Sequence, residues 1–463
     1  MEKHYDLIVI GAGPGGYMAA LYASKAGKRT AVIERSHVGG TCLNCGCIPT
    51  KTYLHTTGLF REVKKTEAAG LHTEGMHVSM AELKKRKDAV VEELRAGIEK
   101  QLAAAKIDLY RGNGVVCGDH LVKVMPEGEE LTAEYILLAA GSEPSSLPIP
   151  GMDLPGVKNS TGILEEETVP DRLIIIGGGV IGMEFATVYN DLGCQVTVLE
   201  AMDKILPGMD KEISQNLKMI MKKRGVEIHT GAMVSSIENM GDGTYLCRYT
   251  EKEKACECSA PLILSAVGRR PCGSGLFSGE MQERIKMERG RILVDERGET
   301  SVPGIYAAGD VIGGVCLAHV ASAEGYRAVS AMFPELKGKD MAVIPSCVYT
   351  DPEIACAGLT ADEAKAAGIE AVTGKYIMSV NGKSVLSMQD RGFLKIVAEK
   401  DTGRILGAGL MCARATDMIG ELELAVSKGL TAEDLAAVIM PHPTFCEGIG
   451  EAAESLCMEK KNK

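Results

Sequence analysis

The sequence predicts an α/β protein that contains two copies of one βαβ unit and ends in an α+β region. A buried-strand pattern runs directly into a glycine-rich turn near the N-terminus, and the same pattern recurs 166 residues later. The last third of the chain mixes strand-like and helix-like segments without a further glycine-rich turn, which is typical of an α+β domain. A chain of 463 residues has room for about two to four domains.

The first unit begins with the apolar run at residues 6–10, which favours a buried parallel strand. Gly11, Gly13 and Gly16 follow in the spacing of a dinucleotide-binding turn. The first glycine makes the tight turn, the second lets the backbone approach a pyrophosphate, and the third lets the helix pack on the strand. A helix and a strand follow, and the strand ends in Glu34, which can accept a hydrogen bond from a ribose hydroxyl.

The second unit repeats this arrangement from the apolar run at residues 172–176. Gly177, Gly179 and Gly182 are followed by Glu200, and in both units the acid lies 23 residues after the first glycine. One copy could be a decayed duplicate without a ligand. Because both copies keep all three glycines and the acid, the sequence favours two bound dinucleotides.

The second acid also predicts which nicotinamide cofactor binds. Glu200 is followed by Ala201, Met202 and Asp203, so this segment has no arginine that could receive a 2′-phosphate. A carboxylate accepts a hydrogen bond from a 2′-hydroxyl and repels a 2′-phosphate. The second unit is therefore expected to bind NAD rather than NADP.

Two linkers divide the chain. The segment 143–156 carries four prolines, and a second break follows the strand-like run 261–267. The expected domains are 1–146 together with 272–340, 147–271, and 341–463. Helices are expected at 80–105, 210–224, 318–332, 360–367, 416–428, 432–438 and 447–460, and strands at 226–229, 233–238, 244–249, 304–310, 345–350, 371–378, 393–398 and 404–411.

Three cysteines within six residues form the most reactive-looking part of the chain. Cys42, Cys45 and Cys47 follow a Gly-Gly pair and precede Lys51. A partly exposed thiol beside a lysine or a helix N-terminus ionises easily and becomes nucleophilic. If two of these cysteines form a disulfide, another group must deliver or remove two electrons. A structural zinc site made of the three cysteines and His55 is an alternative, but C-x2-C-x-C spacing suits tetrahedral closure poorly.

Two further segments carry candidate site residues. Asp310 follows a short strand, at the edge where parallel sheets bind ligands, although an N-cap aspartate would give the same pattern. His442 stands between two prolines, and Glu447 follows five residues later. A carboxylate can fix the tautomer of a histidine and raise its basicity, so this pair suits a general base; a histidine that merely closes a turn is the alternative.

Composition excludes several function classes. The net charge is −11, and the densest basic cluster, residues 84–87, lies in a helical pattern among acids, so nucleic-acid binding is not expected. No apolar run reaches the roughly 18 residues that a membrane span needs. The N-terminus shows no signal or transit pattern, which predicts a cytoplasmic protein. Most of the 15 cysteines are then expected to be reduced.

Taken together, these motifs resemble the flavoprotein disulfide reductases, the class I pyridine nucleotide-disulfide oxidoreductases, over essentially the whole chain. The resemblance rests on residues 11–16, residues 40–51, residues 177–182 with Glu184, Gly309-Asp310, Leu317-Ala318-His319, and His442-Pro443-Thr444 with Glu447. It implies two Rossmann-like domains, FAD on the first and NAD on the second, and a C-terminal dimerisation domain. It also implies a homodimer that oxidises dihydrolipoamide on a lipoyl-bearing protein with NAD+, in a 2-oxoacid dehydrogenase or glycine-cleavage complex.

The resemblance assigns roles to single residues. Cys42 and Cys47 form the redox disulfide: Cys42 meets the substrate and Cys47 contacts the flavin. Lys51 pairs with Glu184 near the flavin, and His442 with Glu447 serves the other subunit's site. The implied cofactor-binding residues are Gly11, Gly13, Gly16, Glu34, Gly40, Thr41, Lys51, Gly114, Gly141, Asp310 and Ala318 for FAD, and Gly177, Gly179, Gly182, Glu200, Val234 and Gly268 for NAD.

Two positions depart from the family pattern. Cys45 stands where an aliphatic residue is usual, and Met440 where many members have a histidine. The main alternative activity is reduction of another acceptor, such as glutathione disulfide, coenzyme A disulfide or mercuric ion. Glutathione-type members carry arginines near the second acid and mercuric members end in a cysteine pair, and this chain has neither feature.

Overall fold

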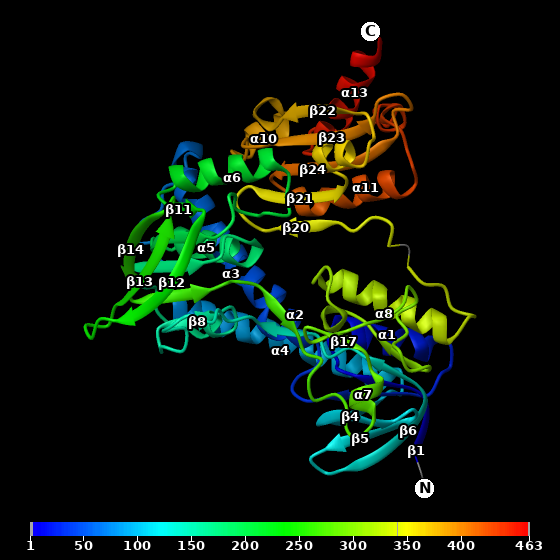
Figure 1. Cartoon of the computed structure of the whole chain (residues 1–463). Helices are drawn as coiled ribbons and strands as arrows, with labels where there is room; N and C mark the ends of the chain where they lie inside the picture. Colours follow the sequence, from blue (N-terminus) through cyan, green and yellow to red (C-terminus); the bar gives the residue numbers. More distant parts are fainter. Residues whose placement is uncertain (1–2, 340, 462–463) are drawn as a thin grey trace.

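The computed structural model describes residues 3–339 and 341–461. They form two α/β parts around sheets with parallel central strands and a C-terminal α+β part around an antiparallel sheet (Figure 1). This arrangement confirms the predicted fold class. Within the described ranges, no helix combines the length and the apolar character needed to cross a membrane.

The first sheet has seven strands and contains the first βαβ unit. β1 (Lys3–Ile10) lies between β2 (Thr30–Glu34) and β6 (Glu129–Leu138), parallel to both, and α1 (Pro14–Lys25) connects β1 to β2. β2 is buried at every position, as expected for a parallel strand that is covered on both faces. The other strands are β3 (Asp108–Arg111), β4 (Asn113–Gly118), β5 (Leu121–Met125) and β19 (Ile305–Ala307).

Two helices that the sequence analysis did not predict carry the cysteine cluster. α2 (Gly40–Cys45) and α3 (Cys47–Lys65) follow β2, then the 3₁₀ turn η1 (Thr66–Ala69) and α4 (Met80–Ala104). Glycines and Pro49 hide the helical pattern here, although proline is tolerated in a first helical turn. The helix expected at 80–105 is α4, and it begins where the Ser79 hydroxyl accepts a hydrogen bond from the Glu82 amide.

The second part repeats the unit in a parallel sheet of order β11-β10-β9-β15-β8. Its elements are β8 (Val157–Asn159), η2 (Gly162–Glu165), β9 (Arg172–Ile176), α5 (Val180–Asp191), β10 (Gln195–Glu200), α6 (Lys211–Lys223), β11 (Glu227–Thr230) and β15 (Leu262–Ser265). An antiparallel sheet of β12 (Ala232–Asn239), β13 (Tyr245–Glu251) and β14 (Lys254–Ala260) packs beside it through a shared apolar cluster.

The two connections between these parts run side by side. β7 (Ser142–Pro144) leaves the first part and pairs antiparallel with β16 (Arg269–Pro271), which returns to it. The chain then passes through α7 (Met281–Arg284), β17 (Met287–Glu288) and β18 (Arg291–Ile292) to β19, which adds to the first sheet beside β6. The 3₁₀ turn η3 (Asp310–Ile312) and α8 (Ala318–Met332) follow, and α8 packs against α1.

The C-terminal part has an antiparallel sheet of order β20-β21-β24-β23-β22. Its strands are β20 (Ser346–Val348), β21 (Glu353–Gly358), β22 (Ala371–Ile377), β23 (Phe393–Glu399) and β24 (Ile405–Cys412), and its helices are α9 (Ala361–Ala366), α10 (Gly382–Leu386), α11 (Ala415–Ser427), α12 (Ala432–Ala436) and α13 (Glu447–Lys461), with the turn η4 (Met378–Val380). β21 was not predicted, because its small residues give a weak strand signal.

A buried ion network joins all three parts. The Asp191 carboxylate, at the end of α5, forms ion pairs with Arg61 of α3 and with Arg224, which follows α6. Asp351, in the turn before β21, also pairs with both guanidinium groups, with N–O distances of 2.9 Å to Arg61 and 3.3 Å to Arg224. Burial raises the pKa of Asp191 although the two arginines lower it. Such a network is costly to form and more costly to break on one side.

We therefore expect Asp191→Ala to lower the free energy of unfolding by about 3–5 kcal/mol, because two mostly buried guanidinium groups lose their buried carboxylate partner and keep only the more exposed Asp351. Urea denaturation followed by circular dichroism measures this change. Arg248→Ala is the control: it breaks exposed pairs with Glu238 and Glu257 and should change stability by less than about 1 kcal/mol. Equal shifts in the two variants would contradict the role of the network.

Candidate active site

One cavity connects the two glycine turns with the cysteine cluster. Its volume is about 1590 Å³, which is larger than the roughly 300–1,000 Å³ of a typical small-molecule site and leaves room for more than one ligand. The predicted site residues that line it are Gly11, Gly13, Glu34, Gly40, Thr41, Cys42, Cys47, Lys51, Gly114, Gly141, Gly177, Gly179, Glu184, Glu200, Val234, Gly268, Asp310 and Ala318. Gly16, Gly182, His442 and Glu447 are not among its lining residues.

The two glycine turns share the same steric constraints. A Cβ on Gly11 would lie 2.3 Å from the Ala139 carbonyl oxygen, and one on Gly177 would lie 2.4 Å from that of Ala266. Both glycines have positive φ, 101° and 108°, which side chains rarely adopt. Each turn therefore requires glycine for its conformation and for its close approach to the neighbouring strand end.

The third glycine of each turn packs the helix against the strand. A Cβ on Gly16 or on Gly182 would lie 1.9 Å from the carbonyl oxygen of the first glycine of its turn. The second glycine differs: a Cβ on Gly13 would meet only the Gly40 Cα, at 3.9 Å, and one on Gly179 nothing within 4 Å. Backbone at Gly13 and Gly179 thus faces open cavity, as a bound pyrophosphate requires. Both turns fit a dinucleotide.

The two acids hold the turns themselves. Glu34 accepts a hydrogen bond from the Ala12 amide at 2.7 Å and from the amide two residues after itself at 2.8 Å. Glu200 accepts the equivalent bonds, from Gly178 at 2.5 Å and from two residues after itself at 2.7 Å. A carboxylate has about four acceptor sites, so each acid retains capacity for a ribose hydroxyl. The sequence suggested only the ribose role; the structure adds a role in shaping the turn.

The two thiols of the predicted redox pair differ in acidity. Cys42 lies in α2, and Cys47 is the first residue of α3. A hydrogen bond from the Cys42 thiol, assisted by the charge of Lys51, lowers the pKa of Cys47 to about 7. The same hydrogen bond and burial raise the pKa of Cys42 far above its usual range. Both cysteines are free in this structure, and Cys47 is the thiol of the pair that ionises first.

A lysine–glutamate pair crosses between the two α/β parts beside the thiols. Lys51 Nζ on α3 lies 2.9 and 2.7 Å from the two carboxylate oxygens of Glu184 on α5. Glu184 is 2% exposed and also accepts a hydrogen bond from the Tyr349 amide at 3.1 Å. The Tyr349 ring stacks on the Lys51 ammonium, 4.8 Å from the ring centroid. Tyr349 was not predicted as a site residue, because it lies more than 160 residues beyond Glu184 in the chain.

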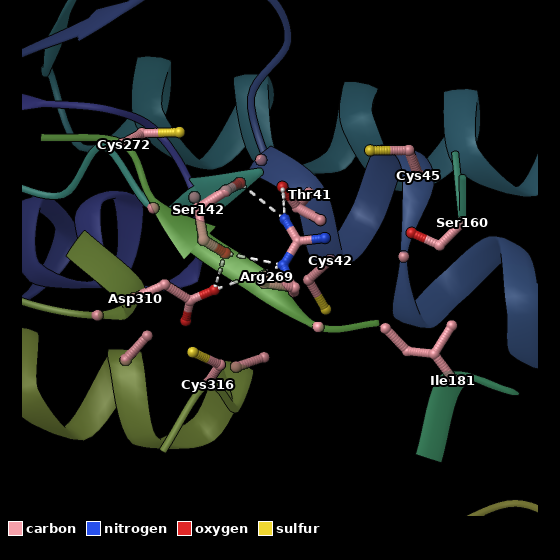
Figure 2. Close-up of a pocket in the computed structure, with 18 of the residues that line it drawn as sticks. Thr41, Cys42, Cys45, Ser142, Ser160, Ile181, Arg269, Cys272, Asp310 and Cys316 are labelled. Carbon is pink, nitrogen blue, oxygen red and sulfur yellow. Dashed lines mark hydrogen bonds and ion pairs between the residues drawn. The ribbon is translucent and has the colours of Figure 1, made fainter. Parts of the chain in front are cut away.

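Cys45 lines the cavity, and its sulfur lies apart from that of Cys42 (Figure 2). In Figure 2 the Cys45 sulfur lies in the upper part of the view, whereas the Cys42 sulfur points downward. Within residues 3–339 and 341–461, no three His, Cys, Asp or Glu side chains come together as a possible metal site.

A second network at the cavity wall was not predicted (Figure 2). Arg269 donates to the Ser142 hydroxyl at 2.8 Å, to the Ser142 carbonyl at 2.7 Å and to the Thr41 hydroxyl at 3.3 Å. Ser142 in turn donates to Asp310, which also lies 3.9 Å from the Arg269 guanidinium. Arg269 follows the carboxyl end of the parallel strand β15, and this position could have identified it as a candidate ligand-binding residue.

α8 begins at Ala318 beside this network, and no side chain caps its first amides. Its free N–H groups therefore face the cavity that Ala318 lines. Such an end suits the electronegative edge of a bound cofactor.

His442 and Glu447 form a pair on the C-terminal part. His442 Nδ1 lies 2.8 Å from the Glu447 carboxylate, which also accepts the Thr444 amide at 2.7 Å. Both bonds lower the pKa of Glu447, and the bond from the Thr444 amide has the larger effect. The His442 side chain is 76% exposed and does not line the cavity of its own chain. The structure thus confirms the contact between the two residues but does not bring them to the thiols.

Comparisons with known proteins agree with this geometry. The family model described as "Pyridine nucleotide-disulphide oxidoreductase" matches residues 5–325, and the model of its dimerisation domain matches residues 344–453. A dihydrolipoyl dehydrogenase of Bacillus subtilis is 39% identical and covers 98% of both chains; one of Geobacillus stearothermophilus is 37% identical and covers 97% of this chain and 95% of its own.

Among solved structures, LpdA of Mycobacterium tuberculosis superposes with a TM-score of 0.89 at 28% identity, over 98% of this chain and 99% of its own. The flavoprotein disulfide reductase RclA of Escherichia coli, as a Cu(II) complex, gives 0.86 at 30% identity over the same shares. From motifs, fold and these similarities, the chain belongs to the pyridine nucleotide-disulphide oxidoreductase family.

Proposed function

We propose that the chain is a dihydrolipoyl dehydrogenase, an NAD-dependent flavoprotein that oxidises protein-bound dihydrolipoamide to lipoamide. The activity named for its relatives supports this function. The observation that carries it is the pair of thiols of unequal acidity in a cavity lined by both glycine turns. A dithiol substrate needs one enzyme thiol to exchange with and one to leave as a stable thiolate.

FAD belongs at the first unit and NAD+ at the second. Gly11, Gly13 and Glu34, with Arg269 and Asp310, would hold the flavin nucleotide; Gly177, Gly179, Glu200 and Val234 would hold NAD+. When bound, FAD would supply an acceptor for the electron pair of the thiols, and NAD+ would supply the final hydride acceptor. The domain division at residues 147 and 272 and near 341 follows from this assignment.

The enzyme's own residues perform the thiol chemistry. In the disulfide form, His442 takes a proton from one substrate thiol, and the thiolate attacks Cys42 and releases Cys47 as a thiolate. The second substrate thiol then attacks the substrate sulfur of this mixed disulfide and displaces Cys42, which closes the lipoamide ring. Lys51 and the Cys42 thiol stabilise the charge on Cys47.

The active unit is a homodimer, in which His442 serves the cavity of the other subunit. The match to the dimerisation domain and the exposure of His442 outside its own cavity support this arrangement. The lipoyl group comes from a partner protein of a 2-oxoacid dehydrogenase or glycine-cleavage complex, and the enzyme works in the cytoplasm. Reduction of glutathione disulfide, coenzyme A disulfide or mercuric ion is the alternative activity.

An acceptor comparison tests the activity. With NADH as donor, kcat/KM for lipoamide should exceed that for glutathione disulfide and for coenzyme A disulfide by at least about 100-fold, because a site shaped for one disulfide rejects others by differential transition-state binding. NADH oxidation followed by absorbance measures all three. A higher value for either rival disulfide would overturn the proposed substrate.

The thiolate assignment predicts a titration. In the two-electron-reduced holoenzyme, the Cys47 thiolate should form with a midpoint near its pKa of about 7, measured by thiolate-to-flavin absorption against pH. Because the pKa is depressed, the thiolate persists above the midpoint and is lost as the pH falls. Lys51→Met should raise the midpoint, since it removes a cation and leaves Glu184 unpaired.

Two variants check this reasoning. Adding Glu184→Gln to Lys51→Met should bring the midpoint part of the way back. Lys64→Met, which removes a lysine from the last turn of the same helix, should leave it unchanged. An unshifted midpoint in Lys51→Met would show that Lys51 does not stabilise the thiolate.

His442→Ala should lower the rate with lipoamide by about 10²–10⁴-fold, because it removes the general base. Glu447→Gln should lower the rate less, because the base only loses its partner. Electron transfer from NADH to ferricyanide uses no substrate thiol and should be unaffected. The exposed His55, replaced by Ala, is the matched control and should keep full activity.

Mixing two inactive variants tests the exchange between subunits. Cys42→Ser and His442→Ala proteins, unfolded and refolded together, should regain about a quarter of wild-type activity, because half of the dimers are mixed and each has one intact site. If His442 acted within its own chain, no mixed dimer would be active.

A further inference from the structure

A second pair of cysteines faces across a hairpin in the NAD-binding part. β13 and β14 are antiparallel, and Cys247 stands directly opposite Cys258. The strands are joined by Lys252 and Glu253, both with positive φ, 49° and 65°, as in the tight turns that close such hairpins. Figure 1 places this hairpin at the outer left edge of the molecule, away from α2.

The register puts these two thiols at disulfide distance. Glu251 and Lys254 flank the two-residue turn as a hydrogen-bonded pair, and pairs alternate along the strands, so Cys247 and Cys258 are also a hydrogen-bonded pair. The Cα atoms of such a pair lie about 5.5 Å apart. The commonest Cα separation across a disulfide is about 5.5–6 Å. Cys256 is diagonal to Cys247, at about 7–8 Å, and is a poorer partner.

The two thiols are unequal in the way that the active-site pair is. Cys247 is fully buried, at 0% exposure, and Cys258 is half-buried. A hydrogen bond between the thiols lowers the pKa of Cys258, and the same bond with burial raises the pKa of Cys247. Cys258 is thus the more accessible and more nucleophilic sulfur, and Cys247 stands behind it.

We propose that Cys247 and Cys258 are a second redox-active dithiol, which a hydroperoxide converts to a disulfide. The Cys258 thiolate attacks the outer peroxide oxygen, the O–O bond breaks, and an alcohol or water leaves as Cys258 becomes a sulfenic acid. The Cys247 thiol then attacks the Cys258 sulfur, the S–O bond breaks, and water leaves with the thiol proton. Two electrons pass from the two sulfurs to the peroxide, and a dithiol restores both thiols by exchange.

The pair is tested in the FAD-loaded holoenzyme, first fully reduced and then treated with hydrogen peroxide. Mass spectrometry of a non-reducing digest should show the peptide of Cys247 joined to the peptide that holds Cys256 and Cys258, with the loss of two hydrogens. The link should persist in Cys256→Ala, the matched control on the same strand, and should vanish in Cys258→Ala. In Cys247→Ala, dimedone should trap a sulfenic acid on Cys258.

Wild type and Cys256→Ala decide the pairing without any buried substitution, and flavin content shows whether Cys247→Ala is folded. Absence of the link while Cys42 and Cys47 are fully oxidised would overturn the proposal. A link that is lost in Cys256→Ala and kept in Cys258→Ala would overturn it equally. In Cys258→Ala, dimedone could instead label Cys247. Labelling as fast as that of Cys258 in Cys247→Ala would contradict the assigned order of attack.

Discussion

The ion pair between Lys51 and Glu184 is the contact on which the site depends. It joins α3, which begins at Cys47, to α5, which begins at the second glycine turn, so it fixes the thiols relative to the NAD-binding unit. Tyr349 adds the C-terminal part through its amide and its ring. Breaking a buried pair on one side leaves an uncompensated charge, so this contact constrains all three parts together.

The duplicated unit explains why one cavity can serve two cofactors. In both copies, contacts within the protein leave no room for a side chain at the first and third glycines, whereas the second glycine faces open space. Sterics alone thus separate residues that build the turn from residues that face the ligand. The acids do both, because each holds two amides of its own turn and keeps free lone pairs.

The sequence predicted most of what depends on local pattern: both βαβ units, the helix now seen as α8 and the contact of His442 with Glu447. It did not predict features that depend on contacts between distant residues, or helices whose sequence pattern is weak. In the sequence, Arg269 belongs to a segment interpreted as a linker. In the fold, the pairing of β7 with β16 brings it into contact with Ser142. α2 and α3 were not predicted because their glycines and proline lower the helix propensity of this segment. Tertiary contacts override that propensity in the fold. The proposed approach of His442 to a thiol of another subunit is not a contact within one chain, so neither local pattern nor this fold determines it.

The two thiol pairs show that acidity alone does not define a catalytic disulfide. In each, one thiol donates to the other, which separates their pKa values in the same direction. Cys47 borders the cavity that the glycine turns line, so electrons that reach it can continue to a cofactor. Cys258 instead packs against an apolar cluster and borders no such cavity. A disulfide there would be reduced by a dithiol from solvent, which suits a pair that records oxidation.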